Sequence, residues 1–141
     1  MPTLIETLQV QHDEIMRIIE RLSAALKRAD LSGVCTELDA LGSALKAHLA
    51  IEDAQLYPAL TLAAEQTQLE VPTKIARTYE HNMSTISVAL TAFLEKYSHA
   101  FSLENFGRDW VLVSQLLRDR IESEEATLYP LYRSWVVRAE R

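Results

Sequence analysis

Apolar side chains recur at helical spacing through almost the whole chain, and this period constrains the fold more than any other feature. In the first segment the stripe steps by four, three, four, three and four residues, through Leu8, His12, Ile15, Ile19, Leu22 and Leu26. Such steps place side chains on one face of an α-helix. Three glycines and four prolines in 141 residues leave little room for hairpin turns. The chain is therefore predicted to be all-α.

Four helical segments of this kind are predicted, over residues 3–29, 34–65, 73–97 and 106–138. Gly33 is expected to separate the first two, and Pro72 is expected at the start of the third. Pro58 is expected to kink or break the second segment near Tyr57. Because the connections are short, the predicted fold is an up-down-up-down four-helix bundle. No linker or shift in composition divides the chain, so residues 1–141 are expected to form a single domain.

The second and fourth segments share a motif at an offset of 72 residues. Residues 48–58 read HLAIEDAQLYP and residues 120–130 read RIESEEATLYP, with glutamate, alanine, leucine, tyrosine and proline in register. A weaker match at an offset of 69 residues joins His12 to His81. We interpret the chain as two helical hairpins related by an approximate two-fold. Such a two-fold places equivalent residues around the bundle axis, where bundles build cofactor and metal sites.

Six ionisable residues fall on or beside the predicted interior stripes, namely His12, His48, Glu52, His81, Arg120 and Glu124. A histidine and a carboxylate four residues apart project to the same side of a helix and suit one metal ion. Taken alone, a histidine on an apolar stripe is more often a hydrogen-bonded core residue than a ligand. Here three of the four stripes turn polar near mid-helix, and buried carboxylates are costly without a cation. These residues therefore predict a polar site on the bundle axis.

Four neighbours of these residues are given lesser roles. Glu125 is expected to face solvent, and Glu125 and Asp53 are reserve ligands if a helix is slightly rotated. Tyr57 and Tyr129 lie beyond the polar layer and are expected to pack at the helix kinks rather than to take part in chemistry.

With these motifs the sequence resembles the hemerythrin-like family, the HHE cation-binding domain, over nearly its whole length. The resemblance rests on QHDE at 11–14, HLAIEDAQLYP at 48–58, EHN at 80–82 and EEATLYP at 124–130. It implies a four-helix bundle that holds a non-haem di-iron site. Members of this family carry or sense dioxygen, handle nitric oxide, or act as iron-responsive modules.

The resemblance also implies a role for each matching residue. His12 and His48 would bind one iron ion, and His81 would bind the second. Glu52 and Glu124 would bridge the two ions. The resemblance thus implies five metal ligands from all four helices.

Two positions depart from the family pattern. Arg120 stands where the family usually has a histidine, and position 77, one turn before His81, is Arg77 rather than a second histidine. Arginine stays protonated and has no lone pair to give a metal, while its five donors suit carboxylates. A guanidinium from Arg120 can reach Glu52 and Glu124 and occupy the volume of the missing second ion. The site is thus expected to be mononuclear or an incomplete di-iron site.

Three functions remain open from the sequence. The first is a metal-binding protein, with iron as the family expectation, although two histidines and two carboxylates also accept zinc or manganese. The second is a metal-free bundle in which Arg120 replaces a metal and the domain serves as a structural or interaction module. The third is an iron enzyme, which is the least favoured because no substrate pocket or separate general base is evident.

Composition limits the partners. The net charge of −6, without a basic run, argues against nucleic acid. No apolar run is long enough to span a bilayer, and no basic amphipathic stretch suits a membrane surface. The first residues lack the pattern of a secretory signal, and the single Cys35 cannot form an internal disulfide. A cytoplasmic protein is expected, with dioxygen or nitric oxide as its partner, and the oligomeric state is left open.

Overall fold

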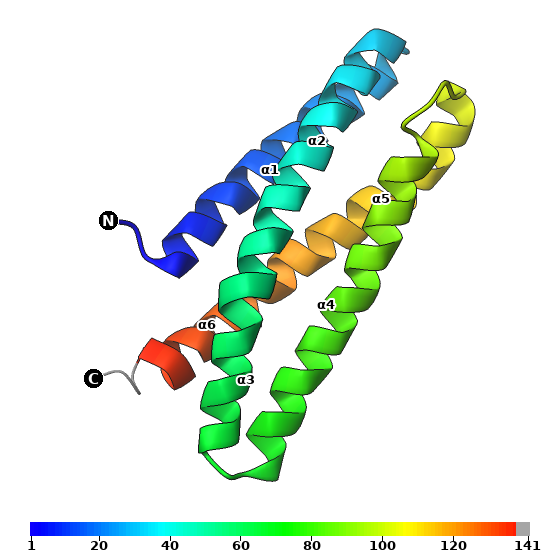
Figure 1. Cartoon of the computed structure of the whole chain (residues 1–141). Helices are drawn as coiled ribbons and strands as arrows, with labels where there is room; N and C mark the ends of the chain where they lie inside the picture. Colours follow the sequence, from blue (N-terminus) through cyan, green and yellow to red (C-terminus); the bar gives the residue numbers. More distant parts are fainter. Residues whose placement is uncertain (138–141) are drawn as a thin grey trace.

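Helices account for nearly all of residues 1–137, the part of the chain that the computed structural model describes. The long helices are α1 (Leu4–Lys27), α2 (Leu31–Ile51), α4 (Glu70–Lys96) and α5 (Leu103–Ser123). Helix α2 continues through a π-helical turn, Glu52–Leu56, into α3 (Tyr57–Gln66). Helix α5 continues likewise through Glu124–Leu128 into α6 (Tyr129–Tyr132) and a last π-helical turn, Arg133–Val137. The predicted all-α four-helix bundle is confirmed, with no strand in residues 1–137 (Figure 1).

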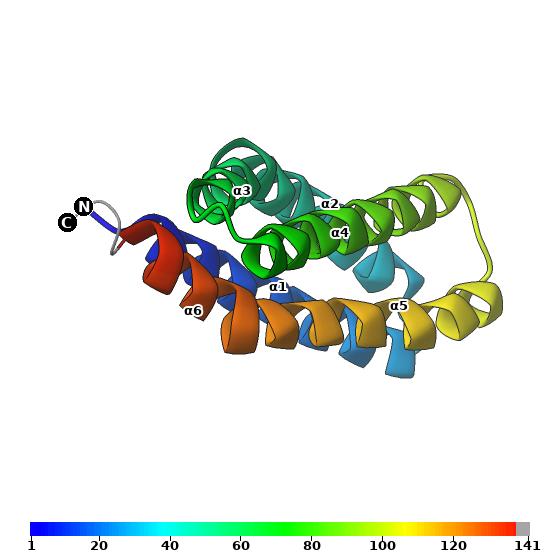
Figure 2. The ribbon, with the colours of Figure 1, turned by 90° about the horizontal axis from the view of Figure 1, so that it is seen from below.

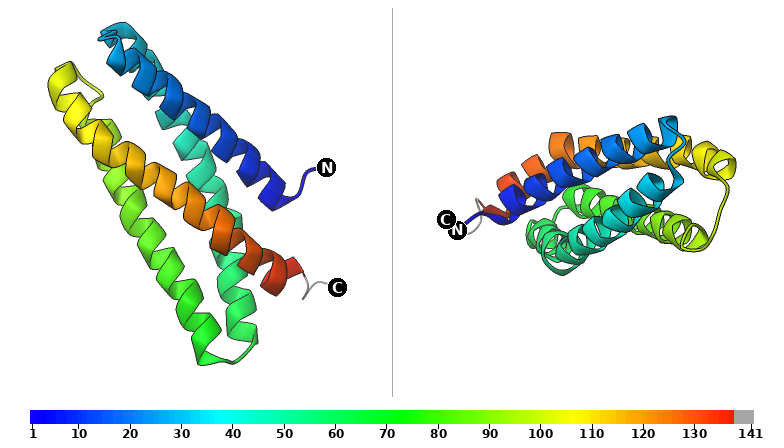
Figure 3. Two further views of the ribbon diagram at one scale, coloured as in Figure 1. Left: turned by 180° about the vertical axis from the view of Figure 1, so that it is seen from behind. Right: turned by 90° about the horizontal axis from the view of Figure 1, so that it is seen from above.

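The bundle has two layers. Helix α1 lies with α5 and α6 in one layer, and α2 and α3 lie with α4 in the other (Figures 2 and 3). No helix within the described residues is long and apolar enough to cross a membrane. The predicted end of the last helix, at residue 138, lies outside the described residues.

The helices α2, α4 and α5 each begin three residues earlier than predicted, and side-chain caps explain two of these starts. The Asp30 carboxylate accepts a hydrogen bond from the Gly33 N–H at 3.0 Å, so α2 begins at Leu31 and Gly33 lies inside its first turn. The Ser102 hydroxyl accepts from the Asn105 N–H at 3.2 Å, so α5 begins at Leu103. The capping bond, rather than glycine as a helix breaker, sets these helix starts.

The two copies of the repeated motif have the same local structure. In each copy a π-helical turn starts at the glutamate and ends just before the tyrosine–proline pair. The Tyr57 N–H bonds to the Glu52 carbonyl, and the Tyr129 N–H bonds to the Glu124 carbonyl, five residues back in both cases. Pro58 therefore sits in the first turn of α3, and the helix widens before it instead of breaking.

A polar layer divides the interior of the bundle into two hydrophobic clusters. The first cluster lies toward the α1–α2 and α4–α5 connections and includes Ile15, Leu22, Leu41, Phe106, Trp110 and Leu117. The second lies at the other end and includes Ile5, Leu8, Leu56, Leu60, Leu128 and Tyr129. Between them the buried side chains are ionisable: His12, His48, Glu52, Arg120 and Glu124. The predicted polar interruption of the stripes thus becomes one layer of the folded bundle.

Candidate metal centre

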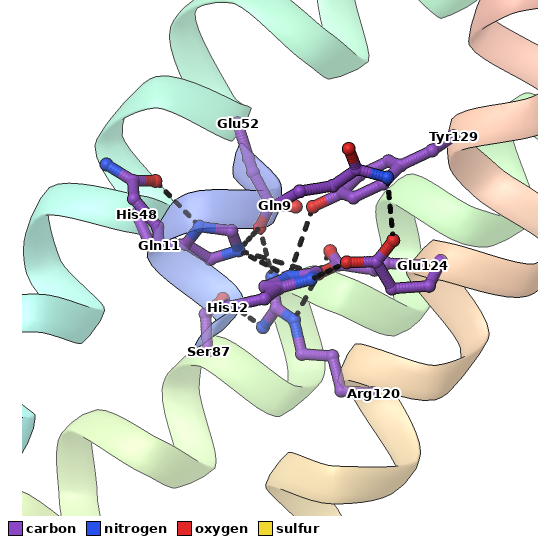
Figure 4. Close-up of polar contacts among 10 residues, drawn as sticks. Gln9, Gln11, His12, His48, Glu52, Ser87, Arg120, Glu124 and Tyr129 are labelled. Atoms are coloured by element: carbon purple, nitrogen blue, oxygen red, sulfur yellow. Dashed lines mark hydrogen bonds and ion pairs between the residues drawn. The ribbon is translucent and has the colours of Figure 1, made fainter. Parts of the chain in front are cut away.

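Each residue of the polar layer is held by a packed helix and shielded from water. His12 comes from α1, His48 from α2 and Arg120 from α5, with exposed fractions of only 2%, 3% and 5%. Glu52 and Glu124 begin the two π-helical turns and are fully buried. The repeated motif therefore aims a carboxylate at the axis from two helices, as its register predicts (Figure 4).

Three side chains converge on one buried point. The His12 Nε2 atom lies 2.8 Å from Glu124 Oε1 and 3.1 Å from His48 Nε2. The His48 Nε2 atom lies 3.5 Å from the same Glu124 oxygen. The three residues place one possible ligand atom each within 4.8 Å of one another, and all three are buried. These are two nitrogen donors and one oxygen donor facing a common centre.

The Nδ1 atom of each imidazole, on the side away from the centre, is hydrogen-bonded to a neighbouring side chain. The His12 Nδ1–H donates to Glu125 Oε1 at 2.8 Å, and the Gln9 amide donates to the other oxygen of Glu125 at 3.0 Å. The His48 Nδ1–H donates to Gln11 Oε1 at 2.8 Å. These bonds place the proton of each neutral imidazole on Nδ1, so both Nε2 lone pairs point inward. A metal-ligating histidine is usually oriented in this way by an outer partner.

Arg120 occupies the opposite side of the layer. Its Nη2 atom donates to Glu52 Oε1 at 2.8 Å, and its Nε atom lies 3.6 Å from Glu124 Oε2. Its Nη1 atom donates a longer bond, 3.4 Å, to the Ser87 hydroxyl. The guanidinium therefore lies against both carboxylates (Figure 4), as the sequence predicts.

The two carboxyl groups titrate as a pair. Burial and the nearby Glu124 raise the pKa of Glu52 to about 10, because two like charges are costly in a dry site. Burial alone would also raise the pKa of Glu124, but its neighbours Glu52, His12, His48 and Arg120 hold that pKa below its usual value. Without a metal, the pair therefore shares one proton at neutral pH.

The donor set fits one divalent ion. Ligand atoms at about 2.1 Å from a metal lie about 3.0 to 3.4 Å apart in octahedral or tetrahedral arrangements. The distances of 2.8, 3.1 and 3.5 Å between the inner atoms of His12, His48 and Glu124 span this range. Glu52 Oε2 and Glu124 Oε2 are buried and have no hydrogen-bond partner. Fully ionised Glu52, Glu124 and Glu125 with Arg120 carry two net negative charges, which one divalent ion neutralises.

A family model for the hemerythrin HHE cation-binding domain matches residues 3–132. The chain belongs to this family. No match was found among the curated proteins or among the solved structures. Family membership implies cation binding, and this hemerythrin domain has a buried His–His–Glu cluster that suits it.

His81 is not where the resemblance implies. In this hemerythrin domain His81 is exposed on α4 and lines a groove of about 1210 Å³ between α4 and α5. The buried face of α4 carries Ala76, Met83, Leu90 and Phe93. His81 precedes Met83 by two residues, which is about 200° around the helix, so it faces away from the axis. We therefore leave His81 out of the ligand set and correct its expected position.

Three contacts of the centre were not predicted. Glu125 was expected in solvent, yet it is half-buried against His12. The hydroxyl of the fully buried Tyr129 donates to His12 Nε2 at 3.1 Å, although only packing was expected of it. Gln11 belongs to the motif at 11–14, but no contact with His48 is predicted for it. One signal was available for Tyr129, because a tyrosine follows both glutamates at a spacing of five residues.

Proposed function

We propose that this hemerythrin domain binds a single divalent metal ion, with His12, His48 and Glu124 as ligands and Glu52 beside them. The observation that supports it most directly is the pair of inward Nε2 atoms, both held from behind and 3.1 Å apart. Two imidazole lone pairs and a carboxylate at such distances suit a shared cation between them. Iron is the ion that the family leads us to expect, and the proposed role is binding or sensing of dioxygen, nitric oxide or iron itself.

Arg120 makes the proposed centre mononuclear. Its guanidinium is a fixed cation against Glu52 and Glu124, the carboxylates that would otherwise bridge to a second ion. A second divalent ion at this position would be repelled by the positive charge of Arg120 at a few ångströms. It would also have no imidazole ligand from α4, because His81 faces away. We infer that the guanidinium takes the place of the second ion.

The bundle supplies a dry site for a small ligand. Ferrous iron held by two imidazoles and carboxylates keeps open coordination positions, which is the chemistry that the bound ion would contribute. Leu8 and Ile15 pack on either side of His12 along α1 and exclude water. The Tyr129 hydroxyl is a buried donor next to the same nitrogen. This donor is suited to a hydrogen bond with a small polar ligand at the centre.

A metal-free role is the second candidate, and one observation favours it. The Arg120 guanidinium and a proton shared by Glu52 and Glu124 together neutralise the two carboxyl groups without any ion. In that case the domain would be a structural or interaction module with an arginine–glutamate–histidine network at its axis.

Metal analysis after anaerobic reconstitution with ferrous iron separates the two candidates. We expect one iron per chain after removal of excess metal, and loss of that iron in His48→Ala. His99→Ala is the matched control, because His99 is an exposed histidine in the α4–α5 connection and should leave iron content unchanged. A reconstituted wild-type protein without iron would refute metal binding and favour the metal-free network.

A further inference from the structure

A groove rich in acidic residues lies against the outer side of the centre. It has a volume of about 640 Å³ and runs between the first π-helical turn and α4. Asp53, Glu80 and Glu95 line it, and no basic side chain does. None of these three carboxylates forms an ion pair with any residue in 1–137, although the Thr61 hydroxyl donates to Glu80 at 3.3 Å. Among the described residues, the groove therefore has three acidic side chains and no basic side chain in its lining.

The inner wall of the groove borders the polar layer. Tyr57 lines the groove but is only 4% exposed, and its buried hydroxyl has no hydrogen-bond partner. Its backbone N–H bonds to the Glu52 carbonyl, and Asp53 is the next residue after Glu52. Ser87 also lines the groove, and its hydroxyl accepts the 3.4 Å bond from Arg120. Tyr57 and Ser87 thus line the groove on the side of the polar layer.

A second groove, on the opposite side of the centre, is lined by charged side chains of both signs. The larger groove between α4 and α5 is also in contact with the polar layer, but through Arg120. Lys74 and His81 line that groove together with Glu70 and Asp119, so its charges are mixed. A cation approaching from there would meet the guanidinium directly, whereas a cation in the acidic groove would meet carboxylates first and would have Ser87 between it and Arg120.

We propose that the acidic groove is the route by which a hydrated divalent cation reaches the buried centre. Asp53, Glu80 and Glu95 concentrate the cation at the mouth, and Tyr57 with Ser87 forms the gate. A groove lined by one sign of charge focuses the electric field and raises the arrival rate of the opposite charge. A route is required because the ligands of the centre are at most 3% exposed. This inference rests on the proposed function, since it assumes that the centre takes a metal.

The test measures the rate of uptake, with cobalt(II) as the probe, because its visible absorption changes when protein ligands replace water. The variant Asp53→Asn/Glu80→Gln/Glu95→Gln removes the charge of the groove. Its matched control, Asp39→Asn/Glu6→Gln/Glu20→Gln, removes three exposed acids outside it. Stopped-flow mixing at low ionic strength should show uptake roughly tenfold slower in the groove variant than in the control. The difference should vanish at about 1 M salt, and the final occupancy should be equal in both.

A second pair of variants adds charge instead of removing it. Ser84→Lys places a cation at the exposed rim of the groove, and Ser43→Lys places one on the exposed face of α2. Only Ser84→Lys should slow cobalt uptake. If both groove variants load as fast as their controls, the route is refuted while metal binding stands. If wild-type protein takes up no metal at equilibrium, both the route and the proposed function fail.

Discussion

Replacing Arg120 by methionine tests whether the guanidinium holds the polar layer together. Methionine keeps most of the side-chain volume and removes the charge. Glu52 and Glu124 are fully buried, and the shortest contact, from Arg120 Nη2 to Glu52 Oε1, is 2.8 Å. Removing one partner of a buried ion pair costs about 3 to 5 kcal/mol, because the other charge is left in a dry site.

Proton uptake by the carboxyl pair reduces this cost. In the metal-free protein the pKa of Glu52 is already raised to about 10 by burial and by Glu124. Without the guanidinium, the folded variant can hold a second proton at low pH. A carboxyl group with a raised folded-state pKa contributes stability at low pH that is lost as pH rises. We therefore expect a loss near 3 kcal/mol at neutral pH, smaller at pH 5 and larger at pH 8.

Urea unfolding of metal-free protein, followed by circular dichroism, measures this loss at the three pH values. Arg118→Met is the matched control, since Arg118 is exposed two residues away, and it should change the free energy of unfolding little. Adding Glu52→Gln to Arg120→Met should recover part of the loss, because it removes one buried acid. A loss below about 1 kcal/mol, typical of an exposed pair, would refute a buried network around Arg120.

Two further predictions concern the metal itself. Arg120→His exchanges the fixed cation for a nitrogen donor, so a second iron is expected to bind. Iron content and visible absorption after anaerobic loading and oxidation report it, and an unchanged iron content would contradict the replacement of an ion by arginine. Metal binding should also displace the proton shared by Glu52 and Glu124, so the affinity for zinc should rise by about tenfold per pH unit between pH 6 and 8. Titrations with a competing chelator at several pH values measure this, and a flat profile would mean that no proton is released.

The sequence predicts the bundle because the stripes follow the helical period over long segments. It also places Arg120 with Glu52 and Glu124, since residues at the same level of a bundle stripe meet at the axis. Helix starts are predicted less well, at residues 34, 73 and 106 rather than Leu31, Glu70 and Leu103, and side-chain caps set the first and last of these. A side-chain cap involves only three residues. The helical spacing of apolar residues can be recognised only over a longer segment, so it does not reveal such a cap.

Glu125 shows why part of the site could not be predicted. A regular helix turns about 100° per residue, and on that basis Glu125 points away from the face of Glu124. The π-helical turn that starts at Glu124 widens the helix there, and Glu125 bonds to His12. Such a turn has no periodic signature of its own in the sequence. His81 differs for another reason: its ligand role is implied by the resemblance at residues 80–82, whereas the apolar face of its own helix turns it away from the axis.

The polar layer has a consequence for cooperativity. Ionisable groups lie between the buried residues of the two hydrophobic clusters, and among the described residues Ile86 is the partly buried apolar side chain that packs against both. Parts of a protein with few shared apolar contacts can open as separate units. The end of the bundle that contains α3 and α6 is thus a unit able to open before the rest unfolds. If the proposed ion is held by α1, α2 and the end of α5, it would tie both units together, and metal content would then set the order in which they unfold.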